Sequence, residues 1–171
     1  IRPEEGLLRM RKKLGLYANI RPTYTFDSLL EKSPIKKSII QGTDLVFVRE
    51  LTGGIYFGKR GRNKTDDYAY DTCEYNVNEI KRLAKIGFEL AMKRSKKLCC
   101  IDKANVLETS RLWRQTVQSL EKNYPEVNVS YEFVDAVAMR LIHSPSYYDV
   151  LITSNLFGDI LSDLAAMLTG S

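Results

Sequence analysis

From residue 43 onward, hydrophobic and polar positions follow strand-type and helix-type patterns in turn, and together these patterns predict an α/β fold. Continuous apolar runs predict buried strands at 45–48, 98–101 and 150–152. Alternation of apolar and polar residues predicts a half-exposed strand at 127–133. Apolar residues at helical spacing predict helices at 80–91, 112–120, 136–142 and 156–168, with Asn78 as the N-cap of the first. Strands and helices therefore alternate along the chain, as in layered α/β domains.

Two segments lie outside this alternation. A short basic helix at 7–14, closed by Gly15, and a proline-containing segment at 19–26 come before residue 43. A long polar excursion runs from Gly53 to Thr72. Long insertions in compact domains usually serve a function or an interface, and we expect this one to do so.

Composition narrows the class of protein. The 171 residues are 44% hydrophobic and 27% charged, which is typical of soluble globular proteins, and no apolar run is long enough to cross a bilayer. The net charge of +5 raises the possibility of nucleic-acid binding. The basic clusters at 9–13, 59–64 and 93–97 are short and far apart, which favours solvated faces, and an anionic small substrate would explain part of the excess equally well.

Cysteine and histidine usage excludes several kinds of site. Cys73, Cys99 and Cys100 give neither a metal-ligand spacing nor an even disulfide framework, so a reducing compartment fits best. His143 is the only histidine, which excludes a histidine-based catalytic triad and a multi-histidine metal site.

The helix at 156–168 carries the most informative charges. Asp159 and Asp163 are its only charged residues, they lie one turn apart on one face, and no Lys or Arg follows Arg140. Two like charges beside apolar neighbours need a cation, and oxygen ligands favour Mg²⁺ or Mn²⁺. The alternative, a solvated helix edge that happens to carry two aspartates, stays open.

Further charged residues suggest an anionic substrate. Arg11, Arg21 and Arg49 could bind carboxylates in two-point contacts. Arg49 directly follows a predicted strand, and ligand sites of α/β folds gather at strand ends. Taken singly, each is equally typical of a surface arginine.

Three residues could move protons or bind a metal. Lys103 follows the strand at 98–101 and could transfer a proton, Tyr56 could act as a phenolic acid, and Asp135 could join Asp159 and Asp163 as a third carboxylate. A loop lysine and a core tyrosine are the simpler interpretations. Together with the arginines, these residues suit metal-assisted chemistry on a small polycarboxylate.

Five motifs in this order carry a resemblance to a known family: Leu-Leu-Arg-Met-Arg-Lys (7–12), Ala-Asn-Ile-Arg-Pro (18–22), Val-Arg-Glu-Leu-Thr-Gly-Gly-Ile-Tyr-Phe-Gly (48–58), Asp-Lys-Ala-Asn-Val-Leu (102–107) and Asn-Leu-Phe-Gly-Asp-Ile-Leu-Ser-Asp (155–163). The chain resembles the β-decarboxylating dehydrogenases of the isocitrate/isopropylmalate dehydrogenase family over essentially its whole length. Family members are longer, so we expect a central fragment.

The resemblance implies a fold and a subunit arrangement. It assigns residues 1–16 to the end of a first domain with a substrate-pocket helix, and 17–171 to the second, dimerisation and substrate domain. The excursion at about 53–72 would be the arm through which two subunits form a shared sheet. In such a homodimer each active site takes Lys103 and Asp135 from the partner subunit.

The resemblance also implies an activity. This is NAD-dependent oxidative decarboxylation of 3-isopropylmalate to 4-methyl-2-oxopentanoate and CO₂ in leucine biosynthesis, with Mg²⁺ or Mn²⁺. Related activities on tartrate, homoisocitrate or isocitrate stay open, as does a noncatalytic metal-binding dimerisation domain if the chain is complete. We expect a cytoplasmic protein without nucleic-acid or membrane partners. An organellar location stays open, because a targeting segment would lie before Ile1.

Residue roles follow from the same resemblance. The arginines Arg11, Arg21 and Arg49 would bind the substrate carboxylates, and the metal ligands would be Asp135, Asp159 and Asp163, with Asp135 also near the substrate. Lys103 would take the proton from the C2 hydroxyl, and Tyr56 would later protonate the enol carbon. The pocket for the isopropyl group would be lined by Leu7, Leu8 and Val106, with Glu4 close by, and Asn105 would face the cofactor.

Overall fold

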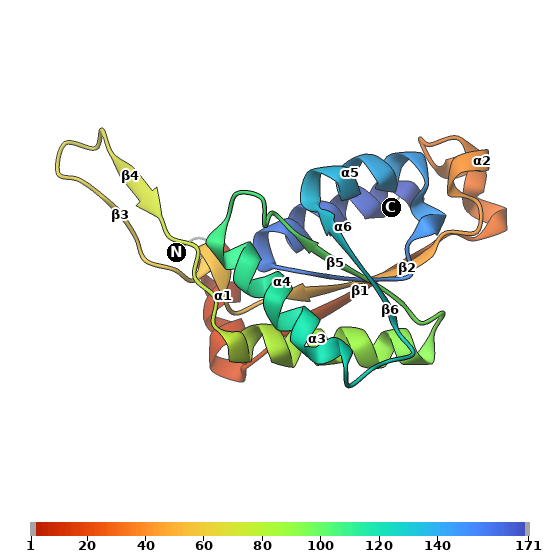
Figure 1. The fold of residues 1–171 in the computed structure, drawn as a ribbon. Helices are drawn as coiled ribbons and strands as arrows, with labels where there is room; N and C mark the ends of the chain where they lie inside the picture. Colours follow the sequence, from red (N-terminus) through yellow and green to blue (C-terminus); the bar gives the residue numbers. More distant parts are fainter. Residues whose placement is uncertain (1–2, 170–171) are drawn as a thin grey trace.

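A five-stranded sheet in the order β1-β2-β7-β5-β6 organises the computed structural model, which describes residues 3–169 (Figure 1). β1 runs antiparallel to β2, and the pairs β2–β7, β7–β5 and β5–β6 are parallel. The strands of this sheet are β1 (Ala18–Tyr24), β2 (Asp44–Glu50), β5 (Lys97–Asp102), β6 (Asn128–Phe133) and β7 (Val150–Thr153). The α-helices are α1 (Pro3–Leu14), α2 (Lys37–Ile40), α3 (Val77–Lys93), α4 (Glu108–Glu121), α5 (Val134–His143) and α6 (Asn155–Thr169). Short 3₁₀ helices are η1 (Asp27–Lys32), η2 (Gly54–Tyr56) and η3 (Pro145–Tyr147).

Helices cover both faces of the sheet, which confirms the predicted α/β class. Figure 1 shows α3 and α4 on one face and α5 and α6 on the other. Each pair packs against the strands through its own hydrophobic cluster. On β2, Val48 joins the cluster of α3 and α4, and Phe47 joins the cluster of α5 and α6. The central strands read as continuous apolar runs because both of their faces are buried.

The proline-containing segment at 19–26, which the sequence pattern left outside the alternation, is largely strand β1 (Ala18–Tyr24). It lies at the edge of the sheet, with Pro22 opposite Val46. Proline has no N–H to donate and is therefore tolerated on edge strands. Only Thr23 of this strand is buried, so the hydrophobic pattern that marks the other strands is weak here.

The predicted N-cap of α3 was wrong by two residues. The cap is Asn76, whose side chain accepts hydrogen bonds from the backbone N–H groups of Asn78 and Glu79. The Glu79 carboxylate in turn accepts from the Asn76 N–H, which completes a capping box. Asn78 is the second residue of the helix and donates to this cap.

The polar excursion at 53–72 is a protruding hairpin. Its strands β3 (Arg60–Arg62) and β4 (Ala69–Asp71) pair antiparallel and project from the body of the molecule (Figure 1). η2 lies at its base.

None of the helices that the structure describes is both long and apolar enough to cross a membrane. The predicted domain boundary between residues 1–16 and 17–171 stays a prediction.

Candidate active site

The predicted functional residues lie at one edge of the sheet. Arg49 is near the end of β2, Lys103 directly follows β5, and Asp135 and Asn155 lie two residues after the ends of β6 and β7. These strands are parallel, so their carboxyl ends share an edge, which is where ligand sites gather in α/β folds. The residues form two groups along it. We call Arg11, Arg21, Arg49, Tyr56, Asp159 and Asp163 the arginine cluster, and Lys103 with Asp135 the lysine pair.

Arg49 and Tyr56 hold Asp159 at the centre of the arginine cluster. The Arg49 side chain is only 4% exposed, and its Nη1 forms an ion pair with Asp159 Oδ1. The Tyr56 hydroxyl donates to Asp159 Oδ2 over 2.7 Å. Burial and this hydrogen bond to a carboxylate both raise the pKa of Tyr56. Tyr56 is therefore protonated near neutral pH.

Arg21 holds the second carboxylate of the cluster. Its Nη1 lies 3.0 Å from Asp163 Oδ1 and donates to Ser162 Oγ over 2.6 Å. The two aspartates lie on one face of α6, as the sequence indicated. Both have basic partners, however, because Arg21 on β1 and Arg49 on β2 contact them. The shortage of basic residues near them is a feature of the sequence and not of the folded molecule.

Arg11 extends the cluster from α1. Desolvation lowers the pKa of its guanidinium, repulsion by Arg49 lowers it further, and Asp159 and Tyr56 act in the opposite direction. These mutual effects place Arg11 within electrostatic reach of the other members. Three guanidinium groups therefore gather around two carboxylates, which leaves positive charge to attract an anion.

Sequence reasoning missed the residue that lets α6 approach Arg49. A Cβ atom on Gly158 would lie 2.6 Å from Arg49 Cγ and 2.9 Å from Thr153 Cγ2. Only glycine fits at this contact without displacing one of these neighbours. A glycine directly before Asp159, inside a helix, was the available signal for close packing. Asn155, buried beneath Arg49, was also missed.

The lysine pair is more exposed. Lys103 Nζ lies 2.5 Å from Asp135 Oδ1, and the Asp135 side chain is 61% exposed. The hydrogen bond from Lys103 lowers the pKa of Asp135.

The backbone that carries Lys103 is well anchored. The Lys103 N–H donates to Ser110 Oγ over 3.0 Å. The preceding Asp102 is buried, accepts two hydrogen bonds from Arg114 at 2.8 and 2.9 Å, and accepts the N–H of Ala104 at 2.8 Å. A fixed loop therefore presents the lysine side chain at the surface.

The two groups do not meet within one chain. β7 and β5 lie between β2 and β6, and strand spacings of about 4.8 Å separate Arg49 from Asp135 by roughly 14 Å along the sheet. Among residues 3–169 no group of three or more acidic, cysteine or histidine side chains could hold a metal. Asp135 therefore does not join Asp159 and Asp163 in a single chain, and the three-aspartate metal site stays a prediction for two chains.

Some of the residues predicted to line the substrate pocket lie on the same element as a member of the arginine cluster, and the others lie on the loop of the lysine pair. Glu4 and Leu7 are exposed and Leu8 is half-buried on α1, the helix that carries Arg11. Asn105 and Val106 are exposed on the loop that carries Lys103. Their roles stay predictions.

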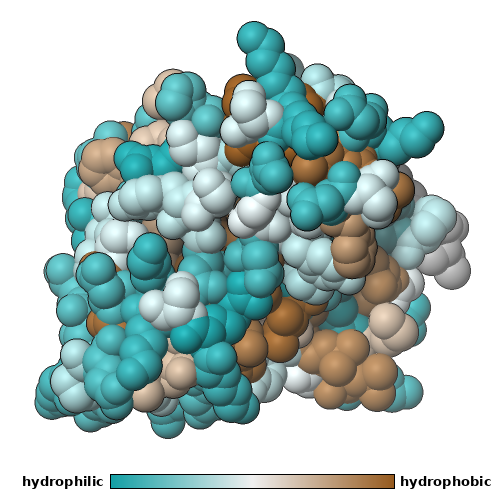
Figure 2. Space-filling model, turned by 90° about the vertical axis from the view of Figure 1, so that its right-hand side faces the viewer, coloured by the Kyte–Doolittle hydropathy of each residue, from teal (hydrophilic) through white to brown (hydrophobic). Residues whose placement is uncertain are grey.

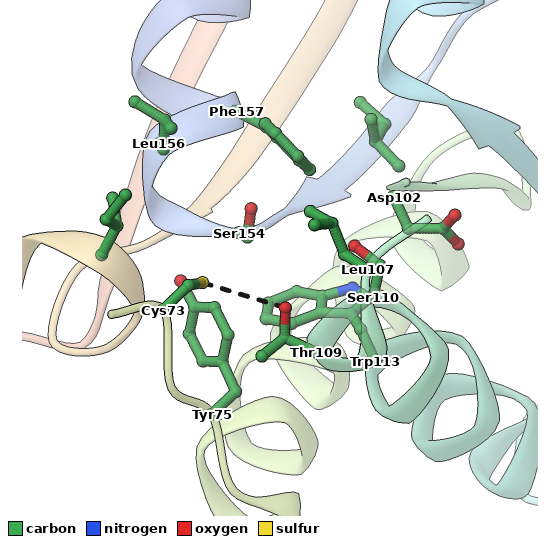
Figure 3. Close-up of a pocket in the computed structure, with 12 residues that line it drawn as sticks. Cys73, Tyr75, Asp102, Leu107, Thr109, Ser110, Trp113, Ser154, Leu156 and Phe157 are labelled. Atoms are coloured by element: carbon green, nitrogen blue, oxygen red, sulfur yellow. Dashed lines mark hydrogen bonds between the residues drawn. The ribbon is translucent and has the colours of Figure 1, made fainter. Parts of the chain in front are cut away.

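An apolar cavity of about 160 Å³ lies beside these groups, between the base of the hairpin and α4 (Figure 3). Cys73, Tyr75, Leu107 and Trp113 are among the residues that line it, as Figure 3 shows. None of the predicted site residues lines the cavity. The charged edge of the sheet, and not this cavity, therefore offers the groups that can bind an anion and move protons.

Comparison with known proteins relates the whole chain to one family. The model of the isocitrate/isopropylmalate dehydrogenase family matches residues 1–171. The chain is 56% identical to 3-isopropylmalate dehydrogenase of Clostridium acetobutylicum over 99% of its length and 48% of that protein. It is 53% identical to the enzyme of the same name from Bacteroides fragilis, over 100% of its length and 48% of that protein.

A solved structure gives the same relationship. The crystal structure of isocitrate dehydrogenase from Methylococcus capsulatus matches 96% of the chain with a TM-score of 0.86 and 35% identity, over 48% of that protein. The chain thus spans about half the length of the curated relatives and of the solved structure that it matches.

Proposed function

The chain belongs to the isocitrate/isopropylmalate dehydrogenase family, and on that premise we propose that it serves the NAD-dependent oxidative decarboxylation of 3-isopropylmalate to 4-methyl-2-oxopentanoate and CO₂, a step of leucine biosynthesis. The observation that carries the proposal is the arrangement of Arg49, Tyr56 and Asp159 at the carboxyl edge of the sheet. A carboxylate-binding group, a protonated acid and a metal-type ligand are in direct contact there.

The arginines would bind and orient the substrate. Arg11, Arg21 and Arg49 approach one surface from α1, β1 and β2, so together they can hold the two carboxylates of a substituted malate. Holding the β-carboxylate until it leaves as CO₂ keeps its bond to the carbon skeleton aligned for cleavage.

Two residues would move protons. Lys103 would take the proton of the C2 hydroxyl while a hydride leaves to NAD⁺. The electrons released by decarboxylation then collect on an enolate, and Tyr56 would protonate its carbon. The raised pKa of Tyr56 means that the phenol holds a proton before that step.

Asp159 and Asp163 suit a hard divalent cation. Mg²⁺ is commonly held by one or two carboxylates together with substrate oxygens, and these two side chains share one face of α6. Asp135 of the partner subunit would add a third carboxylate. When bound, Mg²⁺ or Mn²⁺ would polarise the C2 oxygen and so ease its deprotonation.

Side chains near the arginines favour a branched alkyl substrate. Leu7 and Leu8 on α1 offer apolar surface beside Arg11, and Val106 would complete the pocket from the partner subunit. A third substrate carboxylate, as in isocitrate, would lose water there without gaining a partner. We assign Asn105 to the cofactor side of the pocket.

A homodimer would bring the arginine cluster and the lysine pair together. The protruding hairpin is one surface that could bind a second chain. α5 and α6 offer another, because Met139, Ile142 and Ile160 are 69%, 37% and 60% exposed. Figure 2 shows that hydrophobic residues reach the surface in patches on the side it draws. Apolar surface of this kind is typical of subunit interfaces.

The test is a spectrophotometric assay of NADH formation by the intact protein. We expect NADH from 3-isopropylmalate in the presence of Mg²⁺, little from isocitrate, and none after EDTA treatment. A faster rate with isocitrate would overturn the substrate assignment. Metal binding without any NADH formation would favour a noncatalytic dimerisation domain instead.

A further inference from the structure

We propose that Asn155 is a positioning residue that fixes the orientation of the Arg49 guanidinium, and that Tyr75 and Gly53 hold Asn155 in place. The proposal rests on the proposed function insofar as Arg49 binds the substrate. The contacts themselves are observed, and they do not depend on which substrate is bound.

Asn155 holds the inner edge of Arg49. Its Oδ1 accepts from Arg49 Nε at 3.2 Å and from Arg49 Nη2 at 2.9 Å, while Nη1 contacts Asp159. These contacts use one N–H on each guanidinium nitrogen. The second N–H groups of Nη1 and Nη2 have no partner among residues 3–169. One N–H on Nη1 and one on Nη2 are therefore left for a carboxylate that reaches this side chain, which is 4% exposed.

The amide of Asn155 suits this position because it offers an acceptor and a donor on one planar group. Its Nδ2 donates to the carbonyl oxygen of Gly53 over 3.2 Å, while Oδ1 accepts from Arg49. An aspartate would meet the Gly53 carbonyl with a second acceptor, and a leucine would leave buried donors of Arg49 without a partner. Asn155 is fully buried, so water cannot replace these bonds cheaply.

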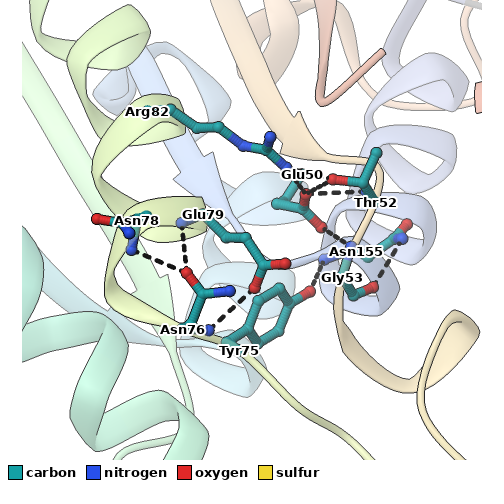
Figure 4. Close-up of polar contacts among 9 residues, drawn as sticks. All are labelled: Glu50, Thr52, Gly53, Tyr75, Asn76, Asn78, Glu79, Arg82 and Asn155. Carbon is teal, nitrogen blue, oxygen red and sulfur yellow. Dashed lines mark hydrogen bonds and ion pairs between the residues drawn. The ribbon is translucent and has the colours of Figure 1, made fainter. Parts of the chain in front are cut away.

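Asn155 is in turn fixed to the base of the hairpin. Its backbone N–H donates to the Tyr75 hydroxyl over 2.9 Å (Figure 4). A Cβ on Gly53 would lie 2.6 Å from Tyr75 Cε1, so the Tyr75 ring packs directly against this turn.

The buried Glu50 carboxylate fixes the same turn. It accepts from the N–H groups of Thr52 and Gly53 over 2.8 and 2.7 Å (Figure 4). Arg82 Nη2 lies 3.8 Å from this carboxylate and also donates to the Thr52 hydroxyl. The Gly53 carbonyl that receives Asn155 therefore belongs to a rigid turn.

The chain offers two ways to loosen Arg49 without removing it. Asn155→Ala deletes both the acceptor for Arg49 and the donor to Gly53. Tyr75→Phe keeps the ring but removes the hydroxyl that accepts from Asn155. Tyr148→Phe is the control, because it removes the hydroxyl of another tyrosine, which donates to Glu132 over 2.9 Å, away from Arg49.

The first readout does not require activity. In ¹⁵N-arginine-labelled intact protein, the Nε–H signal of Arg49, assigned by its loss in Arg49→Lys, should exchange slowly with water. Exchange should accelerate strongly in Asn155→Ala, moderately in Tyr75→Phe, and remain unchanged in Tyr148→Phe. Unchanged exchange in the first two variants would overturn the proposal. If Asn155→Ala fails to fold, as judged by thermal unfolding, Tyr75→Phe alone decides.

The second readout links the contact to the substrate. We expect the KM for 3-isopropylmalate to rise roughly 10- to 100-fold in Asn155→Ala with a smaller fall in kcat, because hydrogen bonds to a charged group are lost and Arg49 binds the ground state as well as the transition state. Equal KM values in Asn155→Ala and Tyr148→Phe would contradict a positioning role. If the wild-type protein does not use 3-isopropylmalate, the proposed function fails, and the exchange measurement still decides the role of Asn155.

Discussion

The arginine cluster and the lysine pair lie on the same edge of one sheet but differ in how they are built. Arg49 is 4% exposed and is held by Asn155 and Asp159, so its position is set within the chain. The Asp135 side chain is 61% exposed and forms an ion pair with Lys103. One group is preorganised by tertiary contacts, and the other is more exposed, with Lys103 on a loop and Asp135 in the first turn of α5.

The difference indicates a division of labour. Groups that bind a substrate in a fixed geometry gain from a rigid surrounding shell. An exposed ion pair contributes little to stability and is easily exchanged for other partners. The exposure of the lysine pair therefore agrees with the proposal that a second chain completes the site, whereas Arg49 cannot move without disturbing α6 and the base of the hairpin.

The strongest test of this comparison is a mixed dimer. Arg49→Ala and Lys103→Ala should each lower kcat/KM by at least about 100-fold, since the first would remove the proposed carboxylate-binding group and the second the proposed proton-transfer group. Random mixing of the two variants should restore about a quarter of the wild-type sites, because half of the dimers become mixed and each mixed dimer contains one intact site. NADH formation after subunit exchange, verified by native mass spectrometry, measures the recovery.

A matched mixture provides the control for this experiment. Arg49→Ala mixed with Arg21→Ala should not recover activity, because both substitutions fall in the arginine cluster and neither shared site would be intact. Recovery in both mixtures, or in neither, would contradict the division into two groups from different subunits.

A second test concerns the metal. Asp159→Asn should weaken Mn²⁺ binding at least 10-fold, since it neutralises a carboxylate of the arginine cluster. Electron paramagnetic resonance titration of free Mn²⁺ measures this affinity. Asp44→Asn is the control, because Asp44 also pairs with an arginine, Arg94, at 2.8 Å. Equal Mn²⁺ affinity in the two variants would identify Asp159 as part of a structural ion pair only.

The smallest effect is expected from Asp135. Lys103 lowers the pKa of Asp135 below its ordinary value of 3.8, so the folded state favours the carboxylate. This stabilisation is present above pH 3.8 and is lost as the pH falls through the lower folded-state pKa. Wild type should therefore be slightly more stable than Asp135→Asn near neutral pH, and the difference should vanish in strong acid.

Urea unfolding as a function of pH measures this difference. High salt should reduce it, because the pair is exposed. In a Lys103→Met background the Asp135→Asn substitution should have almost no effect on stability. A large difference that persists in that background would show that Asp135 is held by contacts other than Lys103.

The sequence was sufficient to predict the strands that are buried on both faces and the helix with a clear apolar spacing. The strands at 45–48, 98–101 and 150–152 were predictable because helices cover both faces, and α6 was predictable from its apolar spacing. Edge strand β1 was missed because it buries little and contains Pro22. The cap at Asn76 was missed by two residues, since both Asn76 and Asn78 are chemically suitable and only the backbone geometry distinguishes them.

For the site, the sequence supplied the residue types and the tertiary structure supplied their partners. The spacing of Asp159 and Asp163 placed both on one face of α6. Residue type and position after predicted strands supplied the candidate arginines, lysine and tyrosine, and motif resemblance supplied their roles. No local pattern relates Asp159 to Arg49, which is 110 positions away, or Asn155 to Gly53, which is 102 positions away. Those contacts, and the separation of Lys103 and Asp135 from the arginine cluster, follow from the order in which the strands assemble in the sheet. That order depends on packing between distant segments, and so it was decided only when the chain folded.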